Sequence, residues 1–259
     1  MDTPYSAKAT KDKEKPLAYI IGAQPFLGLK IYLDSKPLIP RPETEWWTEQ
    51  LFNLIISGNS EVFRRAAARG TAIFQQKNTR PPNSAGDIRF LDLCAGSGAI
   101  GCAALARLPN AQVYFGEIDP THEATILKNI RENNLDLPAG RQANRAHVYI
   151  GDLFEPFGDI EFDVIAVNPP YIPSDRVLPA SVADYEPPLA LRSGPDGLDL
   201  IRRIAHSARR RLAECGVLWC ECDSEHAEAA RALFQEQGFS AEIRTDQYDK
   251  PRIIVVSFP

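Results

Sequence analysis

From residue 88 onward, short apolar runs typical of buried strands alternate with amphipathic stretches. The runs lie at 88–93, 112–117, 146–150, 162–167, 216–222, 240–245 and 252–258. Helices are predicted between most of them, at 98–107, 120–134, 197–213 and 224–237. Strands that alternate with helices predict an α/β fold with a mainly parallel, doubly wound sheet of seven strands.

Two of these segments carry further information. Within 197–213 the apolar residues recur at helical spacing: Leu198, Ile201, Ala205, Ala208 and Leu212. The last two strands are joined only by the short loop 246–251, which leaves no room for a helix. We therefore expect the last strand to be antiparallel.

The first part of the chain follows a different pattern. Residues 1–16 are polar and charged and are interpreted as a disordered tail. Residues 17–40 contain short β-like pieces with turn residues and predict an N-terminal hairpin and linker. The main domain is expected over 41–259, with a helix that begins near Pro42. Within it, 57–87 is interpreted as an insertion or long loop.

Composition narrows the class of protein. The net charge is −5 and the sequence pI is about 5.5, which argues against a generally basic surface for nucleic acid. No apolar stretch is long enough to cross a bilayer, and the N-terminus lacks a signal peptide, so a cytoplasmic location is expected. The five cysteines are scattered. Cys220 and Cys222 share one face of a predicted strand, but no second Cys/His pair has zinc-like spacing, so we expect reduced thiols and no metal site.

A turn of small residues links the strand at 88–93 to the next helix. We call it the glycine turn, and its sequence is Cys94-Ala95-Gly96-Ser97-Gly98. Small residues let the backbone approach a ligand closely, and the start of a helix offers free N–H groups. The turn lacks the full G-x-G-x-x-G pattern, which makes a dinucleotide the less favoured ligand.

Acidic residues follow the next two strands. Glu117 ends the strand at 112–117, at a spacing that suits an acceptor for both ribose hydroxyls of an adenosine. Asp152 follows the third strand, where it can accept a hydrogen bond from the adenine amino group while Leu153 packs on the ring. Each acid alone could be a cap or turn residue. The succession of the glycine turn, Glu117, Asp152 and Asn168 predicts an S-adenosylmethionine site.

The tetrapeptide Asn168-Pro169-Pro170-Tyr171 follows the apolar run 162–167. The side-chain oxygen of Asn168 and the carbonyl of Pro169 can accept both hydrogens of a planar –NH2 group. The prolines restrict the loop and offer no competing N–H, and Tyr171 can pack against the flat group. This arrangement predicts methyl transfer to nitrogen, with a merely rigid loop as the alternative.

Further motifs surround this tetrapeptide. They lie at 38–45 (Leu-Ile-Pro-Arg-Pro-Glu-Thr-Glu), 92–100, 151–154, 168–173, 185–191 and 194–198. With them, residues 17–258 resemble Rossmann-like class I S-adenosylmethionine-dependent methyltransferases, and more narrowly the HemK/PrmC family of protein-(glutamine-N5) methyltransferases.

The resemblance implies methylation of the glutamine in the Gly-Gly-Gln motif of class 1 peptide chain release factors. It implies a protein partner rather than nucleic acid or membrane, and a monomer. The implied catalytic and substrate-binding residues are Asn168, Pro169, Pro170 and Tyr171, with Arg41 and Thr44 helping to close the site. By the same resemblance, the cofactor-binding residues are Cys94, Ala95, Gly96, Ser97 and Gly98 at the methionine part, Glu117 at the ribose, and Asp152 and Leu153 near the adenine. Asn168 is also counted among them.

Other functions remain open at this stage. They are methylation of a ribosomal-protein glutamine, methylation of a base in RNA or DNA, which requires base presentation, and partner binding without catalysis. The chain also departs from the family's pattern in three places. We expect no helical N-terminal recognition domain, Cys94-Ala95 stands where Gly-Thr is common, and 57–87 is longer than expected.

Overall fold

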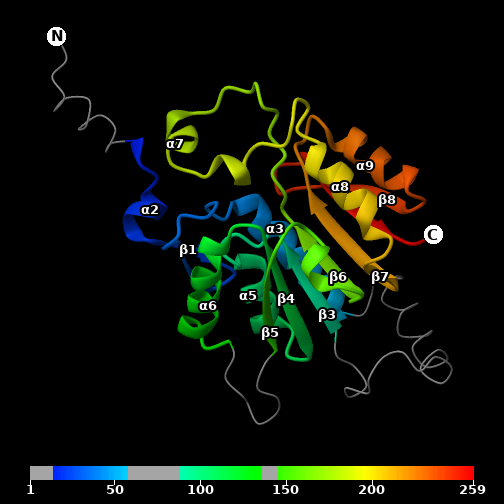
Figure 1. Cartoon of the computed structure of the whole chain (residues 1–259), viewed down its shortest axis with the longest axis horizontal. Coiled ribbons are helices and arrows are strands. Elements are labelled where there is room, and N and C mark those ends of the chain that lie inside the picture. Colours follow the sequence, from blue (N-terminus) through cyan, green and yellow to red (C-terminus); the bar gives the residue numbers. More distant parts are fainter. Residues whose placement is uncertain (1–13, 58–87, 136–144) are drawn as a thin grey trace.

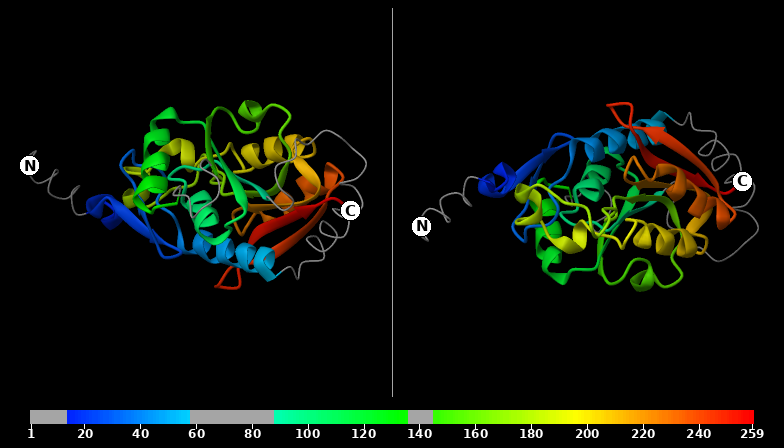
Figure 2. Two further views of the ribbon diagram at one scale, coloured as in Figure 1. Left: turned by 90° about the horizontal axis from the view of Figure 1, so that it is seen from below. Right: turned by 90° about the horizontal axis from the view of Figure 1, so that it is seen from above.

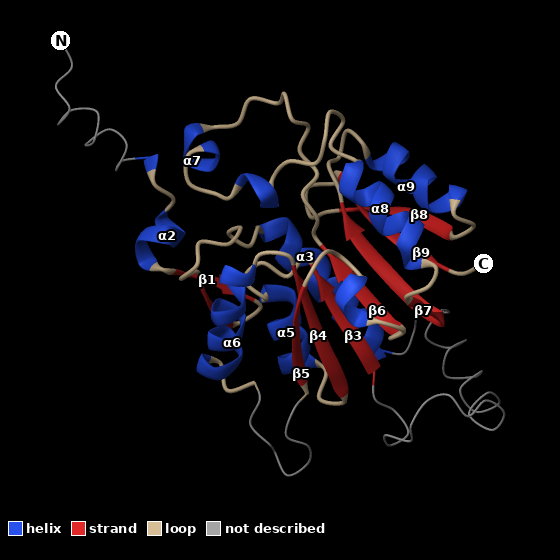
Figure 3. Cartoon of the chain, viewed as in Figure 1, coloured by secondary structure: helices blue, strands red, loops and turns tan. Residues whose placement is uncertain are grey.

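A computed structural model describes residues 14–57, 88–135 and 145–259. Its centre is a seven-stranded sheet with helices on both faces (Figures 1 and 3). The strands are β3 (Ile88–Leu93), β4 (Ala111–Glu117), β5 (Ala146–Ile150), β6 (Phe162–Val167), β7 (Leu212–Glu221), β8 (Ser240–Thr245) and β9 (Pro251–Ser257). Their order is β5-β4-β3-β6-β7-β9-β8, and only β9 runs antiparallel to its neighbours. The predicted α/β class and the antiparallel last strand are confirmed.

The sheet order reverses between β3 and β6. From β3 the chain moves outward to β4 and β5, then returns to form β6 on the other side of β3. At such a switch point the connections leave in opposite directions and open a crevice at the carboxyl ends of the strands. The long connection from β6, with α7 (Ala180–Ala183) and the 3-10 helix η3 (Pro188–Ala190), lies over this edge (Figure 1).

Each face of the sheet has its own apolar core. One is formed with α3 (Pro42–Ser57), α5 (Ala99–Arg107) and α6 (Glu123–Glu132). The other is formed with α8 (Asp199–Ala208), α9 (Ala227–Glu236) and the 3-10 helix η2 (Glu155–Phe157). Figure 2 shows α3 (light blue) and α8 (yellow) on opposite sides of the sheet. Because both faces of the sheet are apolar, helices must cover both of them, and this arrangement is called doubly wound.

A small antiparallel hairpin precedes this domain and is held by α6. It consists of β1 (Ala23–Phe26) and β2 (Leu29–Tyr32), as predicted, and follows the short helix α2 (Leu17–Ile21), which was not predicted. Buried Asn129 accepts the N–H of Tyr32 at 2.7 Å and donates to its carbonyl at 3.0 Å. It also donates to the carbonyl of Ser97 at 2.8 Å, so one side chain links the hairpin to the glycine turn.

One predicted boundary is wrong. The helix expected over 197–213 ends at Ala208, and Leu212 begins β7, opposite Phe162 and four residues before the strand expected from 216. Leu212 is buried in either case, and burial alone does not distinguish a last helical turn from a first strand residue. A register shift between Phe162 and Val164 accommodates the early start of β7.

Two interpretations lie outside the described residues, namely most of the tail at 1–16 and the insertion at 57–87 beyond the end of α3. Over the described ranges, no helix has the length and apolar content that a membrane crossing requires.

Candidate active site

Two cavities meet at the carboxyl edge of the sheet. The first, of about 180 Å³, lies between the ends of β3, β4, β5 and β6. The second, of about 270 Å³, lies on the side of Arg41, Tyr171 and α7. Leu38, Asn168 and Ala190 line both cavities. Asn168 therefore stands where the predicted cofactor side and the predicted acceptor side of the site adjoin.

The glycine turn forms the floor of the first cavity. Its φ angles are +60° at Cys94, +54° at Gly96 and +75° at Gly98. Buried Asp92 accepts the N–H of Gly101 at 2.8 Å and so joins the strand before the turn to the helix after it. Cys94 has a side chain where left-handed backbone favours glycine, at a cost of roughly 1–2 kcal/mol.

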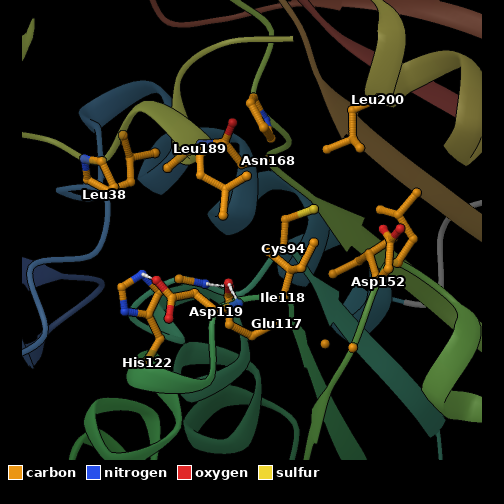
Figure 4. Close-up of a pocket in the computed structure, with 18 of the residues that line it drawn as sticks. Leu38, Cys94, Glu117, Ile118, Asp119, His122, Asp152, Asn168, Leu189 and Leu200 are labelled. Carbon is orange, nitrogen blue, oxygen red and sulfur yellow. Dashed lines mark hydrogen bonds and ion pairs between the residues drawn. The ribbon is translucent and has the colours of Figure 1, made fainter.

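Glu117 closes this turn against the end of β4. One carboxylate oxygen accepts the N–H of Gly96 at 2.7 Å and the other accepts the N–H of Asp119 at 2.9 Å. The side chain is buried and lines the first cavity (Figure 4). A carboxylate oxygen can accept more than one hydrogen bond, so both oxygens keep capacity for a ligand's hydroxyl groups.

Asp152 lies at another end of the same cavity, on the side of Leu200 (Figure 4), and Leu153 also lines this cavity. A carboxylate oxygen of Asp152 accepts a hydrogen bond from Arg203 of α8 at 2.6 Å. Leu153 is buried, with φ at +48°. Arg203 and Leu200 were not predicted as site residues, since on the sequence they belong only to an amphipathic helix.

Asp119 and His122 also line the first cavity and were missed (Figure 4). Asp119 caps the 3-10 helix η1 (Pro120–His122) by accepting the N–H of Thr121 at 2.9 Å. The Nδ1 atom of buried His122 lies 2.8 Å from the Oγ of Ser35. Their position directly after Glu117 was the available signal, because residues just beyond a strand's carboxyl end line the crevice.

The 168–171 loop separates the two cavities. The Nδ2 of Asn168 donates to the Oγ1 of Thr44 at 3.1 Å. Its Oδ1 is buried, and it has no hydrogen-bond partner among the described residues. The hydroxyl of Tyr171 donates to Glu221 at 3.0 Å. Burial, together with the nearby Glu221 charge, raises the pKa of Tyr171 well above its usual value, so the ring carries a neutral phenol.

The motifs at 38–45, 185–191 and 194–198 pack around the 168–171 loop. Arg41 pairs with buried Glu186 at 2.5 Å, and the same carboxylate accepts the N–H of Ile39 at 3.1 Å. Gly197 has φ at +75°, and a Cβ there would lie 2.3 Å from the carbonyl oxygen of Tyr171. Segments 38–45, 185–191 and 194–198 are thus brought around one loop.

Comparison with known proteins decides the family. A family model described as conserved hypothetical protein 95 matches residues 65–184. The release factor glutamine methyltransferase of Geobacter sulfurreducens is 36% identical over 89% of this chain and 69% of its own length. That of Thermodesulfovibrio yellowstonii is 32% identical over 94% of this chain and 77% of its own. The chain belongs to the HemK/PrmC family of glutamine methyltransferases. The family resemblance inferred from the motifs is confirmed, and the protein is a methyltransferase.

Members of the wider class share the fold. The hMettl16 catalytic domain, solved with an RNA hairpin, has a TM-score of 0.57 at 17% identity, over 97% of this chain and 82% of that one. A T. thermophilus 16S rRNA methyltransferase, RsmC, solved with AdoMet and guanosine, has a TM-score of 0.50 at 15% identity, over 92% and 50%. At these identities the likeness extends to the class I architecture of this glutamine methyltransferase and no further.

Proposed function

We propose that the protein transfers a methyl group from S-adenosylmethionine to the side-chain amide nitrogen of a protein glutamine. The proposed acceptor is the Gly-Gly-Gln motif of a class 1 release factor, with the enzyme acting as a monomer in the cytoplasm. The observation that carries the proposal is the buried Oδ1 of Asn168, which lacks a partner in the described structure and lies at the junction of two cavities. A buried acceptor without a donor is costly unless a ligand supplies one.

The first cavity suits the cofactor. Three carboxylates, of Glu117, Asp119 and Asp152, line it beside two arginines, Arg192 and Arg203, the second of which is paired with Asp152. Acidic groups favour a ligand that carries positive charge on sulfur and nitrogen and offers hydroxyl and amino donors. When bound, S-adenosylmethionine supplies an electrophilic methyl carbon on a positively charged sulfur. We propose that the glycine turn holds its methionine part, Glu117 its ribose, and Asp152 and Leu153 its adenine.

The 168–171 loop would align the acceptor. An amide nitrogen is a poor nucleophile because its lone pair is delocalised into the carbonyl. With both N–H groups held by Asn168 Oδ1 and the Pro169 carbonyl, the nitrogen has a fixed orientation, and Tyr171 supports the flat amide. Such alignment can be equivalent to effective molarities of about 10⁵ M or more. We assign Arg41 and Thr44 to closing the site, through the contacts they make with Glu186 and Asn168.

A release factor is favoured over two other acceptors. The net charge of −5 does not favour a nucleic-acid substrate. A ribosomal protein uL3 glutamine methyltransferase from Bradyrhizobium diazoefficiens is also related, at 32% identity over 80% of this chain, but the chain spans 57% of that relative. The relatives over which the chain extends further are named for release factors.

The test is methyl transfer from labelled cofactor to a release factor, to uL3 and to RNA, with mass spectrometry to locate the added methyl group. We expect modification at the Gly-Gly-Gln glutamine. Asn168→Ala should abolish transfer and leave cofactor binding largely intact, whereas Asn53→Ala, at an exposed position of α3, should behave as wild type. Near-normal turnover of Asn168→Ala, or methyl groups found only in RNA, would refute the proposal.

A further inference from the structure

Glu221 is a buried carboxylate behind the acceptor loop, and the function proposed above leaves it without a role. It ends β7 and is 0% exposed. One oxygen, Oε2, accepts from the indole N–H of Trp47 and from the hydroxyl of Thr44, each at 2.7 Å. The other, Oε1, accepts from the hydroxyl of Tyr171 at 3.0 Å. Tyr171 belongs to the 168–171 loop and Thr44 contacts it, so Glu221 is one hydrogen bond away from Tyr171 and two away from Asn168.

The direction of these hydrogen bonds follows from the chemistry of the groups. An indole N–H can only donate, so Oε2 of Glu221 acts as an acceptor. The hydroxyl of Thr44 has a single proton and directs it to the same Oε2. Its oxygen can then only accept from Asn168, and the only donor on that side chain is Nδ2. The Oδ1 of Asn168 is consequently turned away from Thr44.

We propose that Glu221 is a positioning residue that, through Thr44, fixes the amide orientation of Asn168 so that its oxygen faces the acceptor glutamine. The inference rests on the proposed function. Asn168 remains the residue that touches substrate, and Glu221 acts two hydrogen bonds away. Side-chain amides can rotate by half a turn with little change in shape, and hydrogen-bond partners decide between the two states. Glu221, at the end of β7, thus selects one of the two orientations of the Asn168 amide.

The orientation determines which acceptor side chain is tolerated. With Oδ1 and the Pro169 carbonyl both accepting, the site matches the –NH2 group of glutamine and repels the carboxylate of glutamate. If Asn168 were reversed, Nδ2 would face the substrate and would favour a carboxylate. Selectivity for glutamine over glutamate in binding therefore reports the amide orientation, separately from the overall integrity of the fold.

The experiment compares two forms of the acceptor protein that wild type methylates, one with glutamine and one with glutamate at the methylated position. For each variant we would measure the inhibition constant of the glutamate form and the Kd of the glutamine form. The selectivity is the first value divided by the second, and cofactor binding is measured as well. Thr44→Val removes the hydroxyl at nearly constant shape and should lower this ratio about tenfold or more, the equivalent of one buried hydrogen bond of roughly 1.4 kcal/mol. The control variant Thr44→Ser keeps the hydroxyl and should therefore keep the wild-type ratio.

Glu221 is tested directly with two variants. Glu221→Gln can still place an oxygen against Thr44 and Trp47 and turn its amide nitrogen towards Tyr171, so most of the selectivity should remain. Glu221→Met removes every acceptor, which leaves Oδ1 of Asn168 as the partner for the Thr44 proton and reverses the amide. It should therefore lose more selectivity than Thr44→Val. Adding Thr44→Val to Glu221→Met should bring the ratio back to that of Thr44→Val alone.

The outcomes are distinct. A wild-type protein that methylates no glutamine would overturn the proposed function itself. If the wild-type protein methylates glutamine and Thr44→Val has the same selectivity as the wild type, only the role of Glu221 is overturned. If Glu221→Met fails to fold, as judged by loss of cofactor binding and of cooperative melting, the Thr44→Val and Thr44→Ser pair decides. Loss of activity in Thr44→Val with no change in the ratio indicates a merely structural contact and also counts against the proposal.

Discussion

Replacing Gly197 by alanine is expected to displace the acceptor loop. The backbone of Gly197 has φ at +75°, and an added Cβ would stand 2.3 Å from the carbonyl oxygen of Tyr171 and 3.1 Å from a ring carbon of Pro173. Neither neighbour is the free end of a flexible side chain. Relief therefore requires movement of the 168–173 backbone or of the 194–198 segment that supports it.

The magnitude has two parts. A residue with a side chain in left-handed backbone costs roughly 1–2 kcal/mol, and forcing an atom into a filled site costs about 1–3 kcal/mol more. We expect Gly197→Ala to lose about 2–5 kcal/mol of unfolding free energy. Displacement of the loop by about 1 Å is enough to lower turnover about 100-fold.

Gly22→Ala is the matched control. Gly22 has φ at +80°, yet no atom lies within 4 Å of its added Cβ, so only the backbone cost of roughly 1–2 kcal/mol applies. Urea unfolding and methyl transfer to a release factor should be measured on both variants and wild type. Equal stability losses in the two variants, or normal turnover in Gly197→Ala, would refute the close-contact reasoning.

Three further outcomes are expected. Glu117→Ala should weaken cofactor binding in a calorimetric titration, because two carboxylate acceptors are lost, and an unchanged curve would contradict the ribose assignment. Asn129→Ala removes hydrogen bonds to Tyr32 and Ser97 and should lower the unfolding free energy by about 3 kcal/mol in urea, whereas a loss below about 0.5 kcal/mol would mean that the hairpin is held otherwise. Hydrogen bonding to Arg202 lowers the pKa of Asp196 to about 2, below its unfolded value, so that this pair stabilises above about pH 4 and fades as pH falls towards 2. The stability difference between wild type and Asp196→Asn should shrink over that range, and a constant difference would contradict the assignment.

Much of the fold could be predicted because its signals are local. Apolar runs bounded by turns marked the strands, and the strand-end positions of Glu117, Asp152 and Asn168 marked one edge of the sheet. The structure brings these three side chains to the same cavity. Their shared location follows because parallel strands present their carboxyl ends on one side, whatever the details of packing.

The boundary of α8 could not be predicted in the same way. Leu212 continues the helical spacing of its predecessors, yet it pairs with Phe162 as the first residue of β7. Its side chain is buried under either assignment, so local pattern has no preference. The structure settles the choice by pairing Leu212 with Phe162 of β6, a partner 50 residues away that no local pattern in the sequence reveals.

By itself, the sequence determined the class of fold, the edge of the sheet that carries the site and the family to which the motifs belong, because these depend on periodicity and on short contiguous segments. Only the tertiary structure decided what holds the tetrapeptide in place. Glu221 lies 177 residues from Thr44, and Glu186 lies 145 residues from Arg41. Such pairs form only when the order of strands in the sheet and the path of α3 bring distant segments together, and the polarity of the resulting hydrogen bonds exists only after they have met.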